Sequence, residues 1–216
     1  MPSDWDEDSP ELDANIASVV ERVRSDSLAR KPLSLALIKS WHVDLMKGLV
    51  VDDPAYVGRF RGESGVAGYE VGIGSHEGVP SHKVAAEVLE FEAWLQSEVD
   101  TLDKKYPTPA SLTAAGIQEV VDLAAKAHST WVFIHPFANG NGRTARLLAN
   151  SIFLRHGLGL PVTPRPRPLG PYELASSAAM LGNWRPTAQV FMQMLLAAML
   201  ESESAQVPPP PSKKKR

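Results

Sequence analysis

The chain of 216 residues has no cysteine, which excludes a disulfide framework, a thiolate metal site and a cysteine nucleophile. It also lacks an apolar run near the ~20 residues that a helix needs to cross a bilayer. The formal net charge of -3 is small, and no basic face indicates a nucleic-acid surface. The acidic amino terminus has no signal-peptide pattern. We therefore expect a cytoplasmic globular protein that binds neither nucleic acid nor a membrane.

Opposite charges gather at the two ends of the sequence. Residues 1–11 hold five acidic side chains and no basic one, whereas residues 213–216 read Lys-Lys-Lys-Arg behind a run of prolines. We expect an acidic amino terminus with a short amphipathic helix over residues 1–30, a central domain over 31–203 and a disordered Pro-rich basic tail over 204–216. The alternative for the tail is a patch that binds an anionic partner or directs nuclear import.

Helical periodicity covers most of the central sequence, with capping residues and prolines at the starts of the apolar stretches. The sequence predicts helices that begin at Pro10, Pro80 and Pro109, and helices over residues 33–47, 142–156, 172–181 and 185–201. Between the helix over residues 33–47 and the helix that begins at Pro80, glycine is dense and the helical periodicity disappears. There Tyr69, Val71 and Ile73 alternate with other residues at the period of a strand, and residues 74–78 supply a turn that includes His76. We therefore expect a mainly α protein with one small β-hairpin, the alternative being an irregular surface loop.

The segment His135–Arg146, with the sequence HPFANGNGRTAR, carries most of the functional information. Gly140 and Gly142 permit positive φ, so that backbone N–H groups can turn toward an anion. A helix that begins near Gly142 would direct its free N–H groups and its positive dipole end at the same place. Arg143 and Arg146 are three residues apart, share a helix face and can grip phosphate oxygens.

Two asparagines and a histidine complete the chemistry of this segment. Asn141 can donate from its amide to a phosphate, and Asn139 can offer an oxygen to a hard cation. His135 has an unperturbed pKa that suits proton transfer near neutral pH. These groups suit transfer of a phosphorus-containing group to a hydroxyl. The alternative is a structural turn with a capping histidine and surface arginines.

The twelve residues resemble the signature of the Fic family, His-Pro-Phe-x-Asp/Glu-Gly-Asn-Gly-Arg-x-x-Arg, at every fixed position but one. The likeness extends over roughly residues 33–200. Family members are helical proteins, so the resemblance implies a compact helical bundle with the hairpin as a flap beside the active-site loop. Most members transfer AMP from ATP to a Ser, Thr or Tyr hydroxyl of a target protein, with Mg²⁺. The resemblance thus implies an ATP donor, a magnesium cofactor and a protein substrate.

The resemblance also implies a role for each matching residue. His135 would be the general base that deprotonates the target hydroxyl. The anion hole would be formed by Gly140, Asn141 and Gly142. The distal phosphates would be held by Arg143 and Arg146. The backbone of the target would be paired by strand addition to the flap residues Tyr69, Val71 and Ile73.

Asn139 is the one departure from the signature, since the family usually has Asp or Glu there to bind Mg²⁺. Asparagine keeps one oxygen ligand but loses the negative charge, so Mg²⁺ binding should weaken, and Mn²⁺ is an alternative metal. Two other functions stay open. One is a catalytically silent or inhibited module that binds nucleotide or a partner. The other is a Doc-like transferase of a phosphoryl or another phosphodiester group.

Many relatives are held inactive by a helix of pattern Ser/Thr-x-x-x-Glu-Gly/Asn, whose Glu pairs with the second motif arginine, here Arg146. Two degenerate forms of this pattern place Glu21 and Glu201 at the glutamate position. Both forms lack the leading hydroxyl and the trailing small residue, which favours ordinary surface glutamates. The alternative source of inhibition is a small antitoxin-like partner, as in toxin–antitoxin pairs.

Several other polar residues are given ordinary roles. We expect His42 to be a satisfied, partly buried histidine and His128 to pack or form a hydrogen bond in the core. Arg59 and Arg61 should lie at the surface, with steering of an acidic target or ATP as the alternative. Asn183 resembles a family position near the pocket for the nucleotide base.

Overall fold

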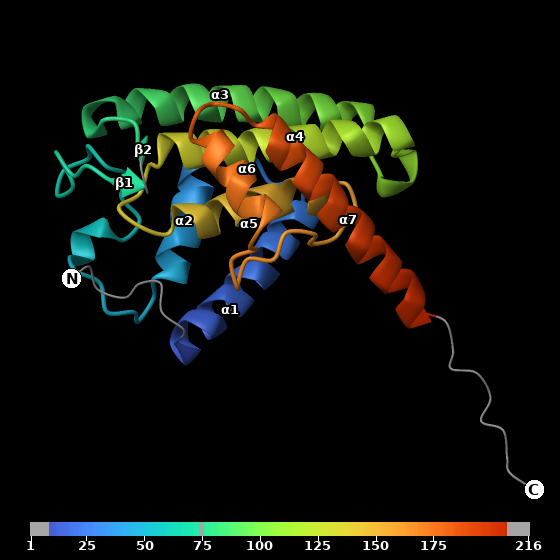
Figure 1. Cartoon of the computed structure of the whole chain (residues 1–216), viewed down its shortest axis with the longest axis horizontal. Helices are drawn as coiled ribbons and strands as arrows, with labels where there is room; N and C mark the ends of the chain where they lie inside the picture. Colours follow the sequence, from blue (N-terminus) through green and yellow to red (C-terminus); the bar gives the residue numbers. More distant parts are fainter. Residues whose placement is uncertain (1–8, 74–75, 207–216) are drawn as a thin grey trace, which may run out of the picture.

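The computed structural model of the protein describes residues 9–73 and 76–206, and these residues are mainly α-helical (Figure 1). The helices are α1 (Pro10–Leu28), α2 (Leu35–Leu45), α3 (Ser81–Lys105), α4 (Ala114–Ile134), α5 (Asn141–Arg155), α6 (Pro171–Ala179) and α7 (Arg185–Gln206). Short 3₁₀ helices span Pro54–Tyr56 and Pro109–Ser111. Strand β1 (Gly72–Ile73) pairs antiparallel with β2 (His76–Glu77). The predicted mainly α fold with one small hairpin is confirmed.

Within the described residues, no helix is both long and apolar enough to cross a membrane.

Helix α5 forms the centre of the bundle. Every residue of α5 except Gly142 is buried. Helix α4 packs against α5 and also contacts α3, α6 and α7, while α1 and α2 pack against α5 from the other side. In Figure 1 the long helices α3 and α4 run together along one side, with α5 between them and α1. The loop that leads into α5 is therefore held between several helices.

The start of α1 follows from local sequence. The Ser9 hydroxyl accepts a hydrogen bond from the backbone N–H of Leu12 at 3.1 Å, and Pro10 occupies the first helical position. The apolar face of α1 is buried through Leu12, Ile16, Val19 and Val23. This predicted helix is confirmed, and it contributes to the same core as α5.

The fourth helix begins later than predicted. Pro109 opens only a short 3₁₀ turn, and α4 starts at Ala114. The reason is a second cap, because the Thr113 hydroxyl accepts from the N–H of Gly116 at 3.0 Å. From this start α4 runs to Ile134, directly before the motif loop.

The hairpin is shorter than the predicted alternation. Pairing of Gly72 with Glu77 leaves only two residues between the strands, so His76 belongs to β2 and not to an exposed turn. Tyr69 and Val71 precede β1, although the N–H of Gly78 donates to the Val71 carbonyl at 3.1 Å and prolongs the pairing. The side chain of Ile73 lies outside the described residues.

Candidate active site

The backbone of the motif loop turns at two residues with left-handed conformations. His135 ends α4 with φ 52° and ψ 57°, a region that residues other than glycine rarely adopt. Gly140 caps α5 with φ 77°, and a Cβ there would lie 2.6 Å from the Met46 methyl carbon. Glycine is thus required at position 140 for both conformation and space.

Gly142 is used differently from what the sequence predicts. Its φ is not positive, because it lies in the first turn of α5. A Cβ at Gly142 would lie 3.3 Å from Nη1 of Arg146. The missing side chain therefore leaves room for this guanidinium beside the amino terminus of α5.

Asn141 braces the loop with its side chain. Its Oδ1 accepts from the N–H of Phe137 at 2.8 Å, and its Nδ2 donates to the Phe137 carbonyl at 2.8 Å. One N–H of Nδ2 is thus used by the loop and the residue is 2% exposed, while donation by the second N–H to a phosphate stays a prediction. Asn141 also leaves its backbone N–H for an anion, in the first turn of α5, where helices have no internal acceptor.

A cluster of aromatic rings packs against the loop. The Phe137 ring lies 5.8 Å from the Trp131 ring of α4 and stacks on His42 of α2 at 3.9 Å. The Trp131 indole N–H donates to the Thr144 hydroxyl at 2.9 Å, which in turn donates to the Gly140 carbonyl at 3.1 Å. These contacts fix the loop to α2, α4 and α5 together.

His42 is a buried histidine with both ring nitrogens satisfied, as predicted. The N–H of Gly58 donates to Nδ1 at 3.0 Å, so the ring carries its proton on Nε2 and donates it to the Asn139 carbonyl at 3.0 Å. Burial lowers the pKa of His42 to about 4, which keeps the ring neutral. The histidine therefore holds the loop at the residue before Gly140.

His128 is also a buried histidine. Its Nε2 lies 2.8 Å from the Tyr172 hydroxyl, and burial lowers its pKa to about 3. Its Nδ1 has no hydrogen-bond partner among the described residues, and the prediction that His128 packs or forms a hydrogen bond in the core is confirmed.

His135 has the protonation state that a general base needs. Its Nδ1 donates to the Val132 carbonyl at 3.1 Å, so Nε2 carries the lone pair. Burial, opposed in part by the bond to Val132 and aided by the charge of Arg61, lowers the pKa of His135 to about 4. The imidazole is therefore neutral near pH 7 and can accept a proton at Nε2.

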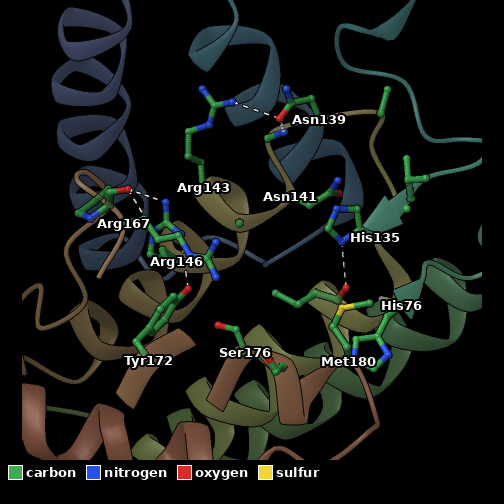
Figure 2. A pocket seen from close by; sticks show the side chains of 18 of the residues that line it. His76, His135, Asn139, Asn141, Arg143, Arg146, Arg167, Tyr172, Ser176 and Met180 are labelled. Carbon is green, nitrogen blue, oxygen red and sulfur yellow. Dashed lines mark hydrogen bonds between the residues drawn. The ribbon is translucent and has the colours of Figure 1, made fainter. Parts of the chain in front are cut away.

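A cavity of about 770 Å³ lies over the loop. Figure 2 shows Arg143, Arg146 and Arg167 on one side of it and His135, His76 and Met180 on the other. The lining comes from the flap, the loop and α5, the connector before α6, and α6 itself. It includes Tyr69, Glu70, Val71, His76, His135, Asn139, Gly140, Asn141, Gly142, Arg143, Arg146, Arg165, Arg167, Tyr172, Ser176 and Met180.

The cavity is electropositive. Among the described residues that line it, four are arginines and one, Glu70, is acidic. Arg146 donates to the Pro164 carbonyl from Nε at 3.0 Å and from Nη2 at 2.8 Å, and to the Tyr172 hydroxyl at 3.4 Å. These acceptors are neutral and leave the positive charge of Arg146 for an anion. A polyphosphate is the ligand that such a cavity attracts most strongly.

Asn139 offers little to a metal ion. Its Oδ1 accepts from the N–H of Gly140 and from Nη2 of Arg143 at 3.4 Å, so a cation there would meet a guanidinium. The described residues contain no group of three or more His, Cys, Asp or Glu placed to hold a metal. Asn139 by itself would therefore supply at most one neutral oxygen ligand to a metal ion.

The two glutamates considered as inhibitors lie away from the motif arginines. The Glu21 carboxylate pairs with Arg24 at 3.6 Å and its side chain is 72% exposed. Glu201 is exposed near the end of α7. Arg146 instead contacts Pro164 and Tyr172, so the described residues show no inhibitory pair with either glutamate.

Two further positions bear on the sequence analysis. Asn183 accepts from the N–H of Arg185 and does not line the cavity, whereas Met180, three residues earlier, does; a place for Asn183 near a pocket for the nucleotide base stays a prediction. Arg61, expected at the surface, is fully buried between the loop and the flap. In the sequence, the burial of Arg61 is indicated only by its two neighbours. Phe60 is buried, and a Cβ at Gly62 would clash with the Ser81 carbonyl.

Comparison with known proteins agrees with this geometry. The sequence profile of the Fic/DOC family matches residues 32–153, more than half of the chain. The chain belongs to the Fic/DOC family. Protein adenylyltransferase Fic of Drosophila mojavensis is 30% identical to this Fic/DOC chain over 145 residues, which cover 64% of the chain and 25% of that protein. Protein adenylyltransferase fic-1 of Caenorhabditis elegans is 33% identical over 137 residues, which cover 62% of the chain and 22% of that protein. The chain thus spans about a quarter of the length of these relatives.

Solved structures share the fold of this Fic/DOC chain. Fic-1 from Caenorhabditis elegans superposes with a TM-score of 0.63 at 22% identity, covering 93% of the chain and 53% of that structure. BepC from Bartonella tribocorum, solved with bound AMPPNP, superposes with a TM-score of 0.56 at 18% identity and covers 87% of each chain. The predicted Fic-type helical bundle is confirmed.

Proposed function

We propose that this protein transfers AMP from ATP to a Ser, Thr or Tyr hydroxyl of a target protein. The observation that carries the proposal is a neutral His135, with its lone pair on Nε2, beside an arginine-lined cavity at the amino terminus of α5. The names of the relatives, protein adenylyltransferases, support the same reaction. The AMPPNP in BepC, an ATP analogue, supports ATP as the donor.

In the proposed reaction the Nε2 of His135 accepts the proton of the target hydroxyl. The hydroxyl oxygen attacks the α-phosphorus of ATP, and the bond from that phosphorus to the oxygen bridging to the β-phosphate breaks. Pyrophosphate leaves with the bonding electrons. Arg143, Arg146 and the free N–H groups at the start of α5 stabilise the charge on the phosphates. The flap residues Tyr69 and Val71 hold the target backbone next to the histidine.

We further propose that Mg²⁺ reaches the site largely on the phosphates of the donor. Mg²⁺ would supply charge neutralisation on the polyphosphate, and Asn139 would add one neutral oxygen. The four arginines that line the cavity already supply positive charge there. Dependence on the metal should therefore be weaker than in a protein with a carboxylate at position 139.

The test separates three functions with ATP labelled at either the α- or the γ-phosphorus. We expect the α-label to enter protein in the presence of Mg²⁺ or Mn²⁺, and the γ-label not to enter. The His135→Ala variant should transfer no label while its ATP affinity, measured by calorimetry, stays within about threefold of wild type. Entry of the γ-label would instead establish a phosphoryl transferase. Binding of ATP without entry of either label would establish a silent module, the function that Asn139 favours.

A further inference from the structure

Arg61 lies fully buried between the motif loop and the flap, with a relative exposure of 0%. All five of its guanidinium N–H groups have an acceptor. Nε donates to the His135 carbonyl at 2.7 Å, and Nη2 donates to the carbonyls of Ile134 at 3.0 Å and Val79 at 2.7 Å. Nη1 contacts the Tyr69 carbonyl at 3.4 Å and the Glu70 carboxylate at 3.3 Å. Every N–H donor of the Arg61 guanidinium therefore takes part in a hydrogen bond.

One half of these contacts closes the end of α4. The carbonyls of Ile134 and His135, which accept from the guanidinium, lie at the carboxyl-terminal end of that helix. The backbone N–H of Arg61 donates to the following carbonyl, that of Pro136, at 2.7 Å. The last carbonyls of a helix have no internal donor and carry the negative end of its dipole. Arg61 therefore fixes the backbone of His135 in its left-handed conformation.

The other half of these contacts holds both sides of the flap. Tyr69 and Glu70 precede β1, and Val79 follows β2. The Glu70 carboxylate also accepts from the Ser81 hydroxyl at 2.7 Å and from its backbone N–H, and these bonds lower the pKa of Glu70. The carboxylate therefore stays ionised opposite Arg61 and ties the flap to the start of α3.

Gly78 shows how closely the flap lies on this assembly. A Cβ at Gly78 would lie 3.0 Å from Nη2 of Arg61, 3.2 Å from the His135 Cβ and 2.9 Å from a Val71 methyl carbon. No positive φ is involved at this position, so space alone requires glycine. The residue that follows β2, the guanidinium of Arg61 and His135 are therefore packed closely together.

We propose that Arg61 is a positioning residue that fixes the flap and His135 relative to each other, so that a target segment paired with the flap presents its hydroxyl to Nε2. The proposal rests on the proposed function for its consequence in catalysis. Arg61 acts through backbone carbonyls and does not touch the reacting atoms. The groups proposed to bind the phosphates lie on α5, to which Arg61 makes no hydrogen bond, so we expect the donor to bind with little change when Arg61 is replaced.

The kinetic test compares Arg61→Lys and Arg61→Gln with the control Arg59→Gln, since the Arg59 side chain is exposed and donates to Ser64 in the same segment. Lysine keeps the charge but offers three N–H groups in place of a planar set of five. We expect kcat to fall about 10²-fold in both Arg61 variants, as for a misplacement near 1 Å, with the ATP dissociation constant within about twofold of wild type. The Arg59 variant should match wild type.

The pH profile separates positioning from a general loss of folded protein. In wild type the acid limb of kcat/KM reflects the low pKa of His135, which the charge of Arg61 helps to depress. We expect this limb to move to higher pH in Arg61→Gln and to stay in place in Arg61→Lys. Loss of folded protein alone would scale the profile down without moving the limb. Full kcat in Arg61→Lys, with an unmoved limb in Arg61→Gln, would overturn the proposal.

Hydrogen exchange gives a readout that needs no activity. We expect the amides of residues 69–73, 76–79, 134, 135 and 137 to exchange faster together in Arg61→Gln. The Gly78→Ala variant, whose Cβ would press on Arg61 and His135, should accelerate the same two segments, and Arg59→Gln should accelerate neither. If the wild-type chain transferred no AMP, the proposed function would fail and this coupling would still be measured. Unchanged exchange in either segment of the Arg61 variant would show that the guanidinium does not join them.

Discussion

Replacing His42 with phenylalanine should destabilise the protein strongly at pH 7 and much less at pH 5. The H42F variant keeps an aromatic ring of similar size against Phe137, where the native rings stack at 3.9 Å. It deletes the hydrogen bonds with Gly58 and Asn139, both 3.0 Å long, and leaves a backbone N–H and a carbonyl without a side-chain partner. Each such orphaned group costs roughly 1–3 kcal/mol, so we expect a loss of about 3 kcal/mol at pH 7.

The pH dependence follows from the depressed pKa of His42. Burial lowers it from 6.5 to about 4 in the folded protein. As the pH falls below 6.5, the unfolded chain binds a proton that the folded chain does not, so wild type loses stability until the pH reaches the folded pKa. At about 1.4 kcal/mol per pKa unit, wild type loses about 2 kcal/mol by pH 5. The H42F variant lacks this cost, and the other buried histidines are common to both proteins and cancel in the difference.

Urea denaturation of both proteins at pH 7 and pH 5 measures this effect, with the exposed His82→Phe on α3 as the matched control. The free energy of unfolding should differ between wild type and H42F by about 3 kcal/mol at pH 7 and by about 1 kcal/mol at pH 5. The control should match wild type at both values. An H42F variant that is equally destabilised at both pH values would refute the buried neutral histidine, and one as stable as wild type at pH 7 would refute its role in the loop.

Three further substitutions test the site. Asn139→Asp should raise the affinity for ATP in the presence of Mg²⁺ by about tenfold in calorimetry, because a carboxylate is a far better ligand; an unchanged dependence on Mg²⁺ would remove the residue from the metal site. Gly140→Ala should lower stability by more than Gly159→Ala, since both have positive φ but only Gly140 is crowded, by Met46 and His42; equal losses would show that crowding is unimportant. Arg146→Gln should weaken ATP binding at least about tenfold and leave AMP binding unchanged, because a distal phosphate contact is a charge-assisted bond of roughly 1.5–3 kcal/mol; equal losses for the two ligands would refute that contact.

The helices were predictable because their signals are local. Ser9 and Pro10 mark the start of α1, and the apolar spacing of α5 follows directly from its sequence. The start of α4 was misplaced because Thr108 and Thr113 are both good caps, and only tertiary packing selects the second. Local chemistry thus predicts the presence of an element better than its first residue.

The site was predictable where backbone and residue type determine the chemistry, as at Gly140 with its positive φ. The site was not predictable where a side chain forms hydrogen bonds with residues that are distant in the sequence. The Asn141 amide makes hydrogen bonds to the N–H and the carbonyl of Phe137, which the sequence alone does not specify. Arg61 finds its acceptors up to 74 residues along the chain, at His135, and no local pattern specifies such carbonyls.

The central claim is AMP transfer with His135 as the base, and intact mass spectrometry tests it most directly. The purified chain and its His135→Ala variant are incubated with ATP and Mg²⁺, with a target protein or with the chain itself as the acceptor. The claim predicts that wild type adds the mass of one AMP to a protein hydroxyl and that the variant adds none. Addition of AMP at the same rate by the variant, or addition of a phosphate mass by wild type, would contradict it.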